Sequence, residues 1–263
     1  MTRAVLGSLT AVLVVLELAD AAPSAQGGRP AATISVLATN AIIGPLTALA
    51  EDYRRQTGTE VKVMFETSPA IARRLAAGEV AGIDVLVLAT AAADQAVKDG
   101  KALADGRVHV GRSGVGIAIR RGARRPDVSS VDALKGALQQ ADRVLYTQGA
   151  SGVYVEKLLQ NLGIADQLKA RSQQLTTGDV MLERLAAGTG NEVGFTQVSE
   201  IRRGEELWAV SFVGPLPSAV QNYTSFDAIV LAGSRAADTA RAFVRTLGGP
   251  EARKRIADSG WVF

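Results

Sequence analysis

The feature that most constrains the fold of this chain is a recurring unit of strand, loop and helix. Short apolar runs rich in β-branched residues lie at 33–38, 61–65 and 84–88. Each is followed by a helical pattern, at 42–56, 69–77 and 91–99 respectively. Glycines at 58, 78 and 100 mark the ends of these helices. Strands that alternate with helices predict an α/β fold in which a parallel sheet is covered on both faces.

A second series of the same unit follows an extended stretch at 107–120, which is punctuated by glycine and which we interpret as a crossing between two lobes. Beyond it the pattern predicts helices near 130–139, 153–162 and 179–187, and strands at 143–146 and 192–195. The segments 207–213 and 228–232 return the chain to the first lobe, where helices at 236–247 and 250–258 finish it. The sequence therefore predicts two α/β lobes.

The first 25 residues are excluded from this fold. Arg3 precedes an apolar run at 4–18, and Ala19-Asp20-Ala21 fits a cleavage pattern, as is typical of a secretory signal. Cleavage is expected after Ala21 or Ala25, and it places the protein in the periplasm. The alternative is a membrane anchor or a first core helix, but the run is shorter than the roughly 20 residues that a spanning helix needs.

Composition removes several classes of function. The chain has no cysteine, which excludes disulfides and thiolate chemistry. Its 6 Phe, 4 Tyr and 2 Trp are too few for a base-stacking surface, so nucleic acid is not an expected partner. Phosphate-loop, zinc-protease and serine-hydrolase motifs are missing from the sequence, as is a carboxylate cluster with the spacing of a divalent metal site. No cofactor and no metal are expected.

Four predicted strand ends carry small polar residues at the point where a helix begins. They are Thr39-Asn40, Thr67-Ser68, the loop 149–152 and Thr196-Gln197. A helix N-terminus offers unpaired N–H groups and about half a positive charge, so such ends bind oxyanions. Each loop taken alone is equally typical of ordinary N-capping. Two such ends from each lobe together predict an anion site in a cleft between the lobes.

The residues around these ends also carry a family resemblance. The segments 38–40, 65–78, 83–89, 248–252 and 259–261 resemble the periplasmic molybdate-binding proteins of ABC transporters. The resemblance implies the two-lobe type II periplasmic-binding-protein fold. In it each lobe has a mainly parallel sheet flanked by helices, two strands cross between the lobes, and the ligand lies in the cleft. We expect lobe 1 at 31–110 with 226–263, and lobe 2 at 111–225.

The resemblance also assigns ligand residues, one position at a time. Ser68 matches a serine that binds the oxyanion, and Ala150 and Ser151 fall in a loop whose backbone amides do so. Asn40 or its neighbours replace a first-loop serine, and Thr196 or Gln197 stands where the family has a tyrosine. These replacements suit either a molybdate-type oxyanion or an organic acid. Arg112 would then bind a carboxylate with its guanidinium fork, or else serve as a solvated or lobe-bridging arginine.

A catalytic alternative remains open, because aconitate isomerase resembles the same group. Moving a double bond in a tricarboxylate requires a base near a carbon-bound proton. Glu66, beside Ser68, is the best-placed acid in the sequence, although a strand residue of this kind is equally typical of a water-facing position. Tyr146 and Tyr223 are weaker candidates. His109, the only histidine, is more typical of a structural residue than of a functional one.

The resemblance implies partners as well. A small anionic ligand is expected in the cleft, and a monomeric solute-binding protein would deliver it to an ABC permease. A third interpretation is a ligand sensor that pairs with a membrane receptor, which the sequence does not separate from transport.

Overall fold

The computed structural model describes Met1 and residues 32–263. The predicted secretory signal at 1–25, Met1 apart, lies outside the described residues. Residues 31–263 form one compact unit. In the described part of the chain, none of the helices has an apolar stretch of the length that a bilayer crossing requires.

The first sheet is built by the three strand-helix units that the sequence predicts. Strand β1 (Thr33–Thr39) pairs in parallel with β2 (Glu60–Glu66) and β3 (Val85–Ala89). The helices that follow these strands are α1 (Ile43–Thr57), α2 (Ser68–Ala77) and α3 (Thr90–Lys98). A short 3₁₀ turn, η1 (Asn40–Ile42), lies between β1 and α1. The sheet is therefore mainly parallel, as predicted.

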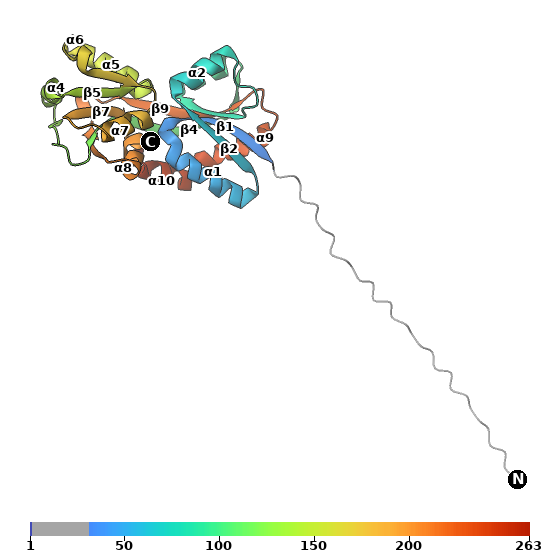
Figure 1. Cartoon of the computed structure of the whole chain (residues 1–263). Coiled ribbons are helices and arrows are strands. Elements are labelled where there is room, and N and C mark those ends of the chain that lie inside the picture. The colour runs from blue at the N-terminus through green and yellow to red at the C-terminus, as the bar shows by residue number, and fades with distance from the viewer. Residues whose placement is uncertain (2–31) are drawn as a thin grey trace. The chain divides into compact units, whose positions relative to one another are not determined.

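The crossing is made by two long antiparallel strands. Strand β4 (Ala102–Arg120) pairs with β9 (Tyr223–Leu231) along its first part and with β7 and β8 along its second. Strand β9 also pairs with β3. The strand order is β2-β1-β3-β9-β4-β7-β5-β6, so β4 and β9 join the two sheets (Figure 1).

The second sheet repeats the plan of the first. Strand β5 (Arg143–Thr147) pairs in parallel with β6 (Ser172–Leu175) and β7 (Glu192–Gln197). Strand β8 (Val210–Pro215) runs antiparallel to β4. Its helices and turns are α4 (Val131–Gln140), α5 (Ala150–Asn161), α6 (Ala165–Leu168), η2 (Lys169–Arg171), α7 (Gly178–Ala186), α8 (Val198–Leu207) and η3 (Ser218–Val220).

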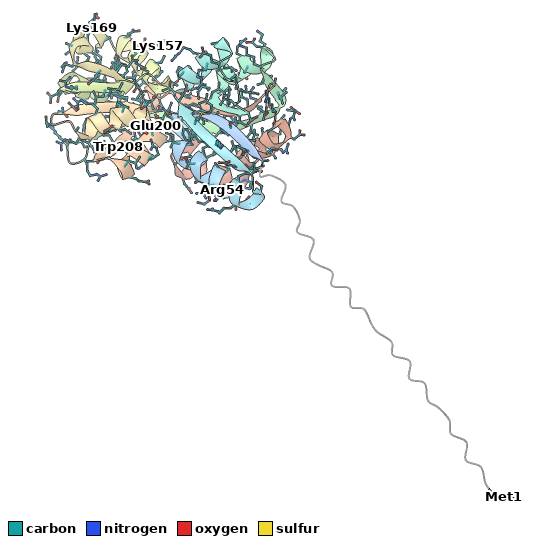
Figure 2. All side chains as sticks on the ribbon, turned by 45° about the vertical axis from the view of Figure 1, so that its right-hand side comes forward. Met1, Arg54, Lys157, Lys169, Glu200 and Trp208 are labelled. Carbon is teal, nitrogen blue, oxygen red and sulfur yellow. The ribbon has the colours of Figure 1, made fainter. Side chains whose placement is uncertain are left out.

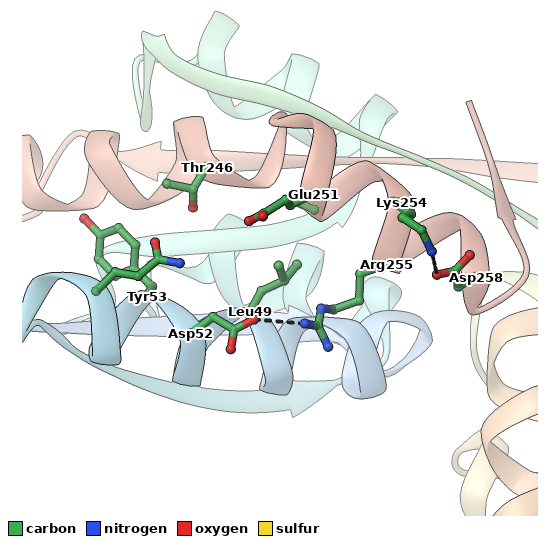
Figure 3. A pocket seen from close by; sticks show the side chains of 10 residues that line it. Leu49, Asp52, Tyr53, Thr246, Glu251, Lys254, Arg255 and Asp258 are labelled. Carbon is green, nitrogen blue, oxygen red and sulfur yellow. Dashed lines mark hydrogen bonds and ion pairs between the residues drawn. The ribbon is translucent and has the colours of Figure 1, made fainter.

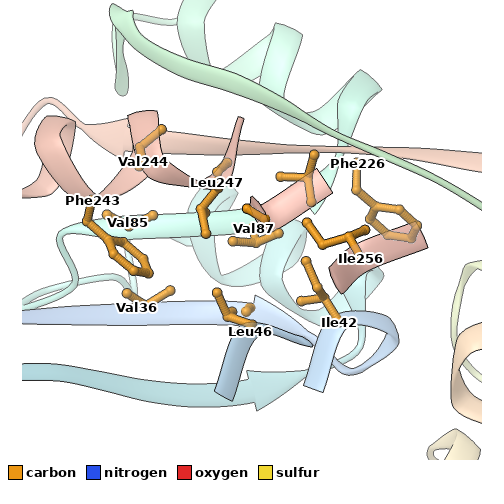
Figure 4. Close-up of a cluster of buried hydrophobic side chains, with 14 of the residues drawn as sticks. Val36, Ile42, Leu46, Val85, Val87, Phe226, Phe243, Val244, Leu247 and Ile256 are labelled. Carbon is orange, nitrogen blue, oxygen red and sulfur yellow. The ribbon is translucent and has the colours of Figure 1, made fainter. Parts of the chain in front are cut away.

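Each sheet is buried on both faces, as a parallel sheet requires. Separate apolar clusters lie on the two faces of the first sheet, and two more lie against the second. Figure 4 shows one of them, in which Val36, Val85 and Val87 of the sheet pack against Leu46, Phe243 and Ile256. Phe243 and Ile256 belong to helices α9 (Ala237–Leu247) and α10 (Pro250–Asp258). After α10, the short strand β10 (Trp261–Val262) pairs with β4.

Helices α6 and α8, strands β6 and β10 and the 3₁₀ turns η1, η2 and η3 were not predicted. Strand β6 is short and polar and carries no clear hydrophobic period, whereas α8 has apolar residues at helical spacing, Val198 and Ile201, within a mostly charged segment. Tertiary contacts also stabilise α8. A Cβ on its Gly204 would come within 2.6 Å of Leu182 on α7, so the two helices pack at close range. The boundaries between lobes at 110/111 and 225/226 stay a prediction.

Candidate anion site at the strand ends

The strand ends converge on one small cavity of about 20 Å³. Seven of the predicted ligand residues line it, namely Thr39, Asn40, Thr67, Ser68, Ala150, Ser151 and Gln197. They come from the ends of β1 and β2 in the first sheet and from the region after β5 and β7 in the second. The cavity is also lined by Ala41, Thr147, Gly149, Gly178, Glu200 and Phe226. The carboxyl ends of parallel strands thus meet here from both sheets.

Ser68 is oriented by a hydrogen bond to the backbone. Its side-chain Oγ accepts from the N–H of Ala89 at 2.8 Å, and the residue is only 4% exposed. A hydroxyl has one donor and two acceptor positions, so this contact leaves the proton free to donate. The preceding residue, Thr67, is the N-cap of α2 but makes no capping bond with its side chain. The start of α2 therefore presents donors to the cavity.

Helix α5 begins in the same way on the opposite side. Its N-cap is Gly149, which has no side chain to cap the first turn. Ser151 is buried at the cavity wall, and within the described part of the chain no side chain hydrogen-bonds its Oγ. Gly152 sets the position of the helix, since a Cβ there would lie 1.6 Å from the carbonyl oxygen of Thr147. The amides at the start of α5 are consequently held against the end of β5.

The third helix start, that of α8, is closed by its own side chains. Gln197 is the N-cap of α8, and its backbone N–H donates to the Glu200 carboxylate at 3.2 Å, which is the glutamate half of a capping box. Thr196 is fully buried and donates its hydroxyl to the Glu200 carboxylate, and it does not line the cavity. Gln197 does line it, and its amide contacts Thr224 on β9 at 3.2 Å.

Glu200 is the functional candidate that the sequence analysis missed. Among residues 32–263 it is the one ionisable side chain that lines the cavity, and it is 6% exposed. Figure 2 labels it near the middle of the folded body, whereas Arg54 lies at the periphery. Burial raises the pKa of Glu200 above its ordinary value, and the hydrogen bonds from Thr196 and Gln197 only partly oppose this rise. The feature of the sequence that could have identified Glu200 is the capping-box spacing from Gln197 to Glu200, directly after a buried strand.

Two other predicted residues lie outside the cavity wall. Glu66 at the end of β2 forms an ion pair with Arg74 at 2.5 Å and is about one-third exposed. Arg112 on β4 is exposed, donates to the Phe263 carbonyl at 3.1 Å and stacks over the ring of Tyr223. The structure therefore gives the catalytic candidate Glu66 and the carboxylate fork of Arg112 no geometric support, because each already has another partner.

The histidine lies beside a buried acid of the first sheet, although its own side chain is exposed. Asp227 on β9 is 2% exposed and accepts from Thr90 at 3.0 Å; it forms an ion pair with Arg107 and contacts the His109 ring. The His109 Nδ1 lies 2.9 Å from this carboxylate. These contacts tie α3 to both crossing strands, which agrees with the structural interpretation of His109. Within residues 32–263, no three His, Cys, Asp or Glu side chains are arranged to hold a metal ion.

Three comparisons agree with this architecture. A relative, aconitate isomerase from a Pseudomonas species, is 31% identical over 237 residues, which are 88% of each chain. The periplasmic molybdate-binding protein of Azotobacter vinelandii has a similar fold, with a TM-score of 0.73 at 19% identity over 88% of this chain and 99% of that one. A periplasmic thiamin-binding protein matches with a TM-score of 0.69 at 15% identity over 90% and 84% of the two chains.

These structural neighbours confirm the predicted two-lobe periplasmic-binding-protein fold. The ligands in their names differ, since one is an oxyanion and the other a vitamin. The fold alone therefore does not identify the ligand. The family profile for bacterial extracellular solute-binding proteins matches residues 34–262. The chain therefore belongs to the bacterial extracellular solute-binding protein family.

Proposed function

We propose that this protein binds a small oxyanion or carboxylate in the cavity at the strand ends. The observation that carries the proposal is the convergence of neutral donors from both sheets. The Ser68 hydroxyl, the Ser151 hydroxyl and the uncapped start of α5 all border one cavity. Backbone amides and hydroxyls at helix starts bind anions without a fixed counter-charge. The similarity in fold to a molybdate-binding protein supports the same ligand class.

We propose that the ligand enters when the two halves of the molecule separate. The cavity of about 20 Å³ has room for little more than one water molecule. Molybdate and organic acids are larger, so the structure corresponds to a closed arrangement. Strands β4 and β9 join the two sheets, and bending within them would open the cleft by a hinge motion. In this interpretation the lobes are 31–110 with 226–263, and 111–225.

We propose further that the protein works in the periplasm as a monomer and delivers its ligand to an ABC permease. The support is its family, the periplasmic neighbours of its fold and the signal-like N-terminal sequence. Export can be checked directly by fractionating cells that express the full chain and by determining the N-terminus of the mature protein. Cleavage after Ala21 or Ala25 is expected.

Titration calorimetry tests the ligand class. Purified protein is titrated with molybdate, tungstate, sulfate and a panel of di- and tricarboxylates, including trans-aconitate. Saturable heat from at least one of them is expected, and its identity separates a metal oxyanion from an organic acid. Loss of that heat in a Ser68→Ala, Ser151→Ala variant would locate the site. No heat from any probe would contradict the proposal.

A second candidate function is isomerisation of a tricarboxylate, as in the relative at 31% identity. One observation favours it: Glu200 supplies the cavity with a carboxyl that could take and return a proton. In that case, adding the protein to trans-aconitate would change the absorbance of the solution. In heavy water, the product would incorporate deuterium. Glu66→Gln and Glu200→Gln variants compare the two acids, and saturable binding without turnover favours transport.

A further inference from the structure

The cavity has a charge balance that conflicts with plain anion binding. Of the side chains that line it, the one that ionises is an acid, Glu200, and none is basic. An ionised carboxylate beside a bound anion is strongly unfavourable at a buried site, because water does not screen the two charges. Anion binding at this site therefore requires that the repulsion between the carboxylate and the anion be removed.

Hydrogen bonding within the protein occupies only one oxygen of this carboxyl. Thr196 Oγ1 and the Gln197 backbone N–H both donate to Oε2, the latter at 3.2 Å. Within the described part of the chain, Oε1 makes no hydrogen bond, although the residue is more than nine-tenths buried. Oε1 lies against Gly178, where a Cβ would come within 2.6 Å of it. A glycine at the start of α7 thus leaves space beside this oxygen.

Nearby charges act on the ionised form in opposite directions, Asp179 against it and Arg203 for it. The charged groups that act on the carboxyl are Asp179, at the start of α7, and Arg203, on α8 itself. Arg203 already forms an ion pair with Asp179 and stacks over Trp208. The other elements packed against α8, which are β4, β7, β8 and η1, add no charged group that acts on it. Burial is the largest effect, and it raises the pKa of Glu200.

We propose that Glu200 contacts the ligand as a neutral carboxylic acid, with the proton on Oε1 donated to an anion in the cavity. The proposal rests on the anion-binding function proposed above. Oε2 remains the acceptor for Thr196 and Gln197, so one carboxyl holds the start of α8 and also supplies a donor to the ligand. When Glu200 is ionised in the free protein, binding an anion takes up one proton from solution. The cavity would thereby select anions that accept a hydrogen bond.

Calorimetry on the full-length mature protein tests this coupling. Molybdate and trans-aconitate are titrated between pH 6 and 9, where both probes are fully ionised, in buffers that differ in ionisation heat. We expect uptake of up to one proton per anion bound. Above the pKa of the free Glu200 carboxyl, affinity is expected to fall up to tenfold for each pH unit.

The decisive variant is Glu200→Gln. Glutamine serves at this position of a capping box and keeps an N–H donor, so the fold and the binding are expected to persist. Its affinity is expected to be independent of pH, without proton uptake. Glu192→Gln is the matched control, because Glu192 is equally buried but pairs with Arg184 outside the cavity. It should keep the pH dependence of the unmodified protein.

Each outcome decides one point. If neither probe nor any other anion of the panel binds, the proposed function fails and the role of Glu200 fails with it. If an anion binds without proton uptake, or with the same pH dependence in the Glu200→Gln variant, the role of Glu200 alone is wrong. Affinity for either anion that rises with pH would contradict the role of Glu200, because the ionised carboxylate would then be the form that binds. Carbon-13 NMR of labelled glutamate, with Glu200→Gln to assign the signal, reads the protonation state directly.

Discussion

Two hollows of this protein differ in size and in the state of their polar groups. A groove of about 580 Å³ lies between α1 and the α9–α10 region, and a cavity of about 20 Å³ lies at the strand ends. In the groove four of the five charged groups are paired: Asp52 bonds Arg255 at 3.0 Å, and Lys254 bonds Asp258 at 2.7 Å, while Glu251 stands apart from them (Figure 3). In the cavity, hydroxyls and helix starts face one unpaired acid.

The difference shows that volume is a poor guide to function in this molecule. The groove is large, but its exposed ion pairs have already satisfied one another, and such pairs gain little from a ligand. The cavity is small, yet its donors lack protein partners in a water-poor site, where an anion would gain most from them. The following changes would break or sharpen this comparison.

The largest effect is expected from Gly152→Ala. The added Cβ would meet the Thr147 carbonyl oxygen at 1.6 Å, and because the clashing atoms are backbone, no side-chain rotation relieves the clash. We expect a loss of about 3 kcal/mol or more in the free energy of unfolding, together with loss of anion binding. Thermal unfolding measures the first and calorimetry the second. Gly136→Ala on α4, where a Cβ meets nothing within 4 Å, is the matched control and should be neutral or slightly stabilising.

The next effect is expected from the two serines of the cavity. Ser68→Ala and Ser151→Ala each remove a hydroxyl that would donate to a charged ligand, a hydrogen bond that contributes about 1.5 to 3 kcal/mol. Affinity for the anion identified by calorimetry should fall about 10- to 100-fold for each. Unchanged affinity in both variants would mean that the ligand binds elsewhere, for example in the groove.

A smaller effect concerns the pH dependence of stability. The folded protein holds the Glu200 proton more tightly than the unfolded chain, in which the pKa is close to 4.5. This carboxyl therefore adds stability that is complete below pH 4.5 and is lost as pH rises through the folded-state pKa. Melting temperatures of the unmodified protein and Glu200→Gln, measured from pH 4 to 8, should diverge in favour of the variant. Parallel curves would show that Glu200 ionises normally.

The smallest effect is expected in the groove. Arg255→Gln removes an ion pair with Asp52 in which the two side chains are 48% and 27% exposed. Such a pair contributes less than about 1 kcal/mol, so stability should change little and anion affinity not at all. A marked loss of affinity in this variant would reverse the comparison and give the groove a role in binding.

Most of the fold could be predicted from the sequence, because its main elements carry their own pattern. The apolar run before Thr39 and the Ser68-Pro69 helix start are local signals, and they placed the first sheet to within a few residues. Strand β6 has no such pattern, and in helix α8 a short apolar stripe stands among many charged residues. Propensity alone does not detect elements of this kind.

The same limit applies to the cavity. The donors Ser68 and Ser151 were predictable, because small polar residues at strand ends share one edge of a sheet. Glu200 was not predicted, since a glutamate three residues after a helix start is usually solvated, and its burial depends on Gly178 and α7. Asp227 was missed for a related reason: a single acid in an apolar strand gives no sign of the arginine, histidine and threonine that surround it.

The late position of β9 along the chain has a consequence for biosynthesis. This strand lies between β3 and β4 in the first sheet, yet more than one hundred residues separate it from either neighbour in synthesis. A nascent chain that stops before Tyr223 cannot close the sheet that begins at Thr33. We therefore expect the first sheet to complete its pairing only when translation is nearly finished.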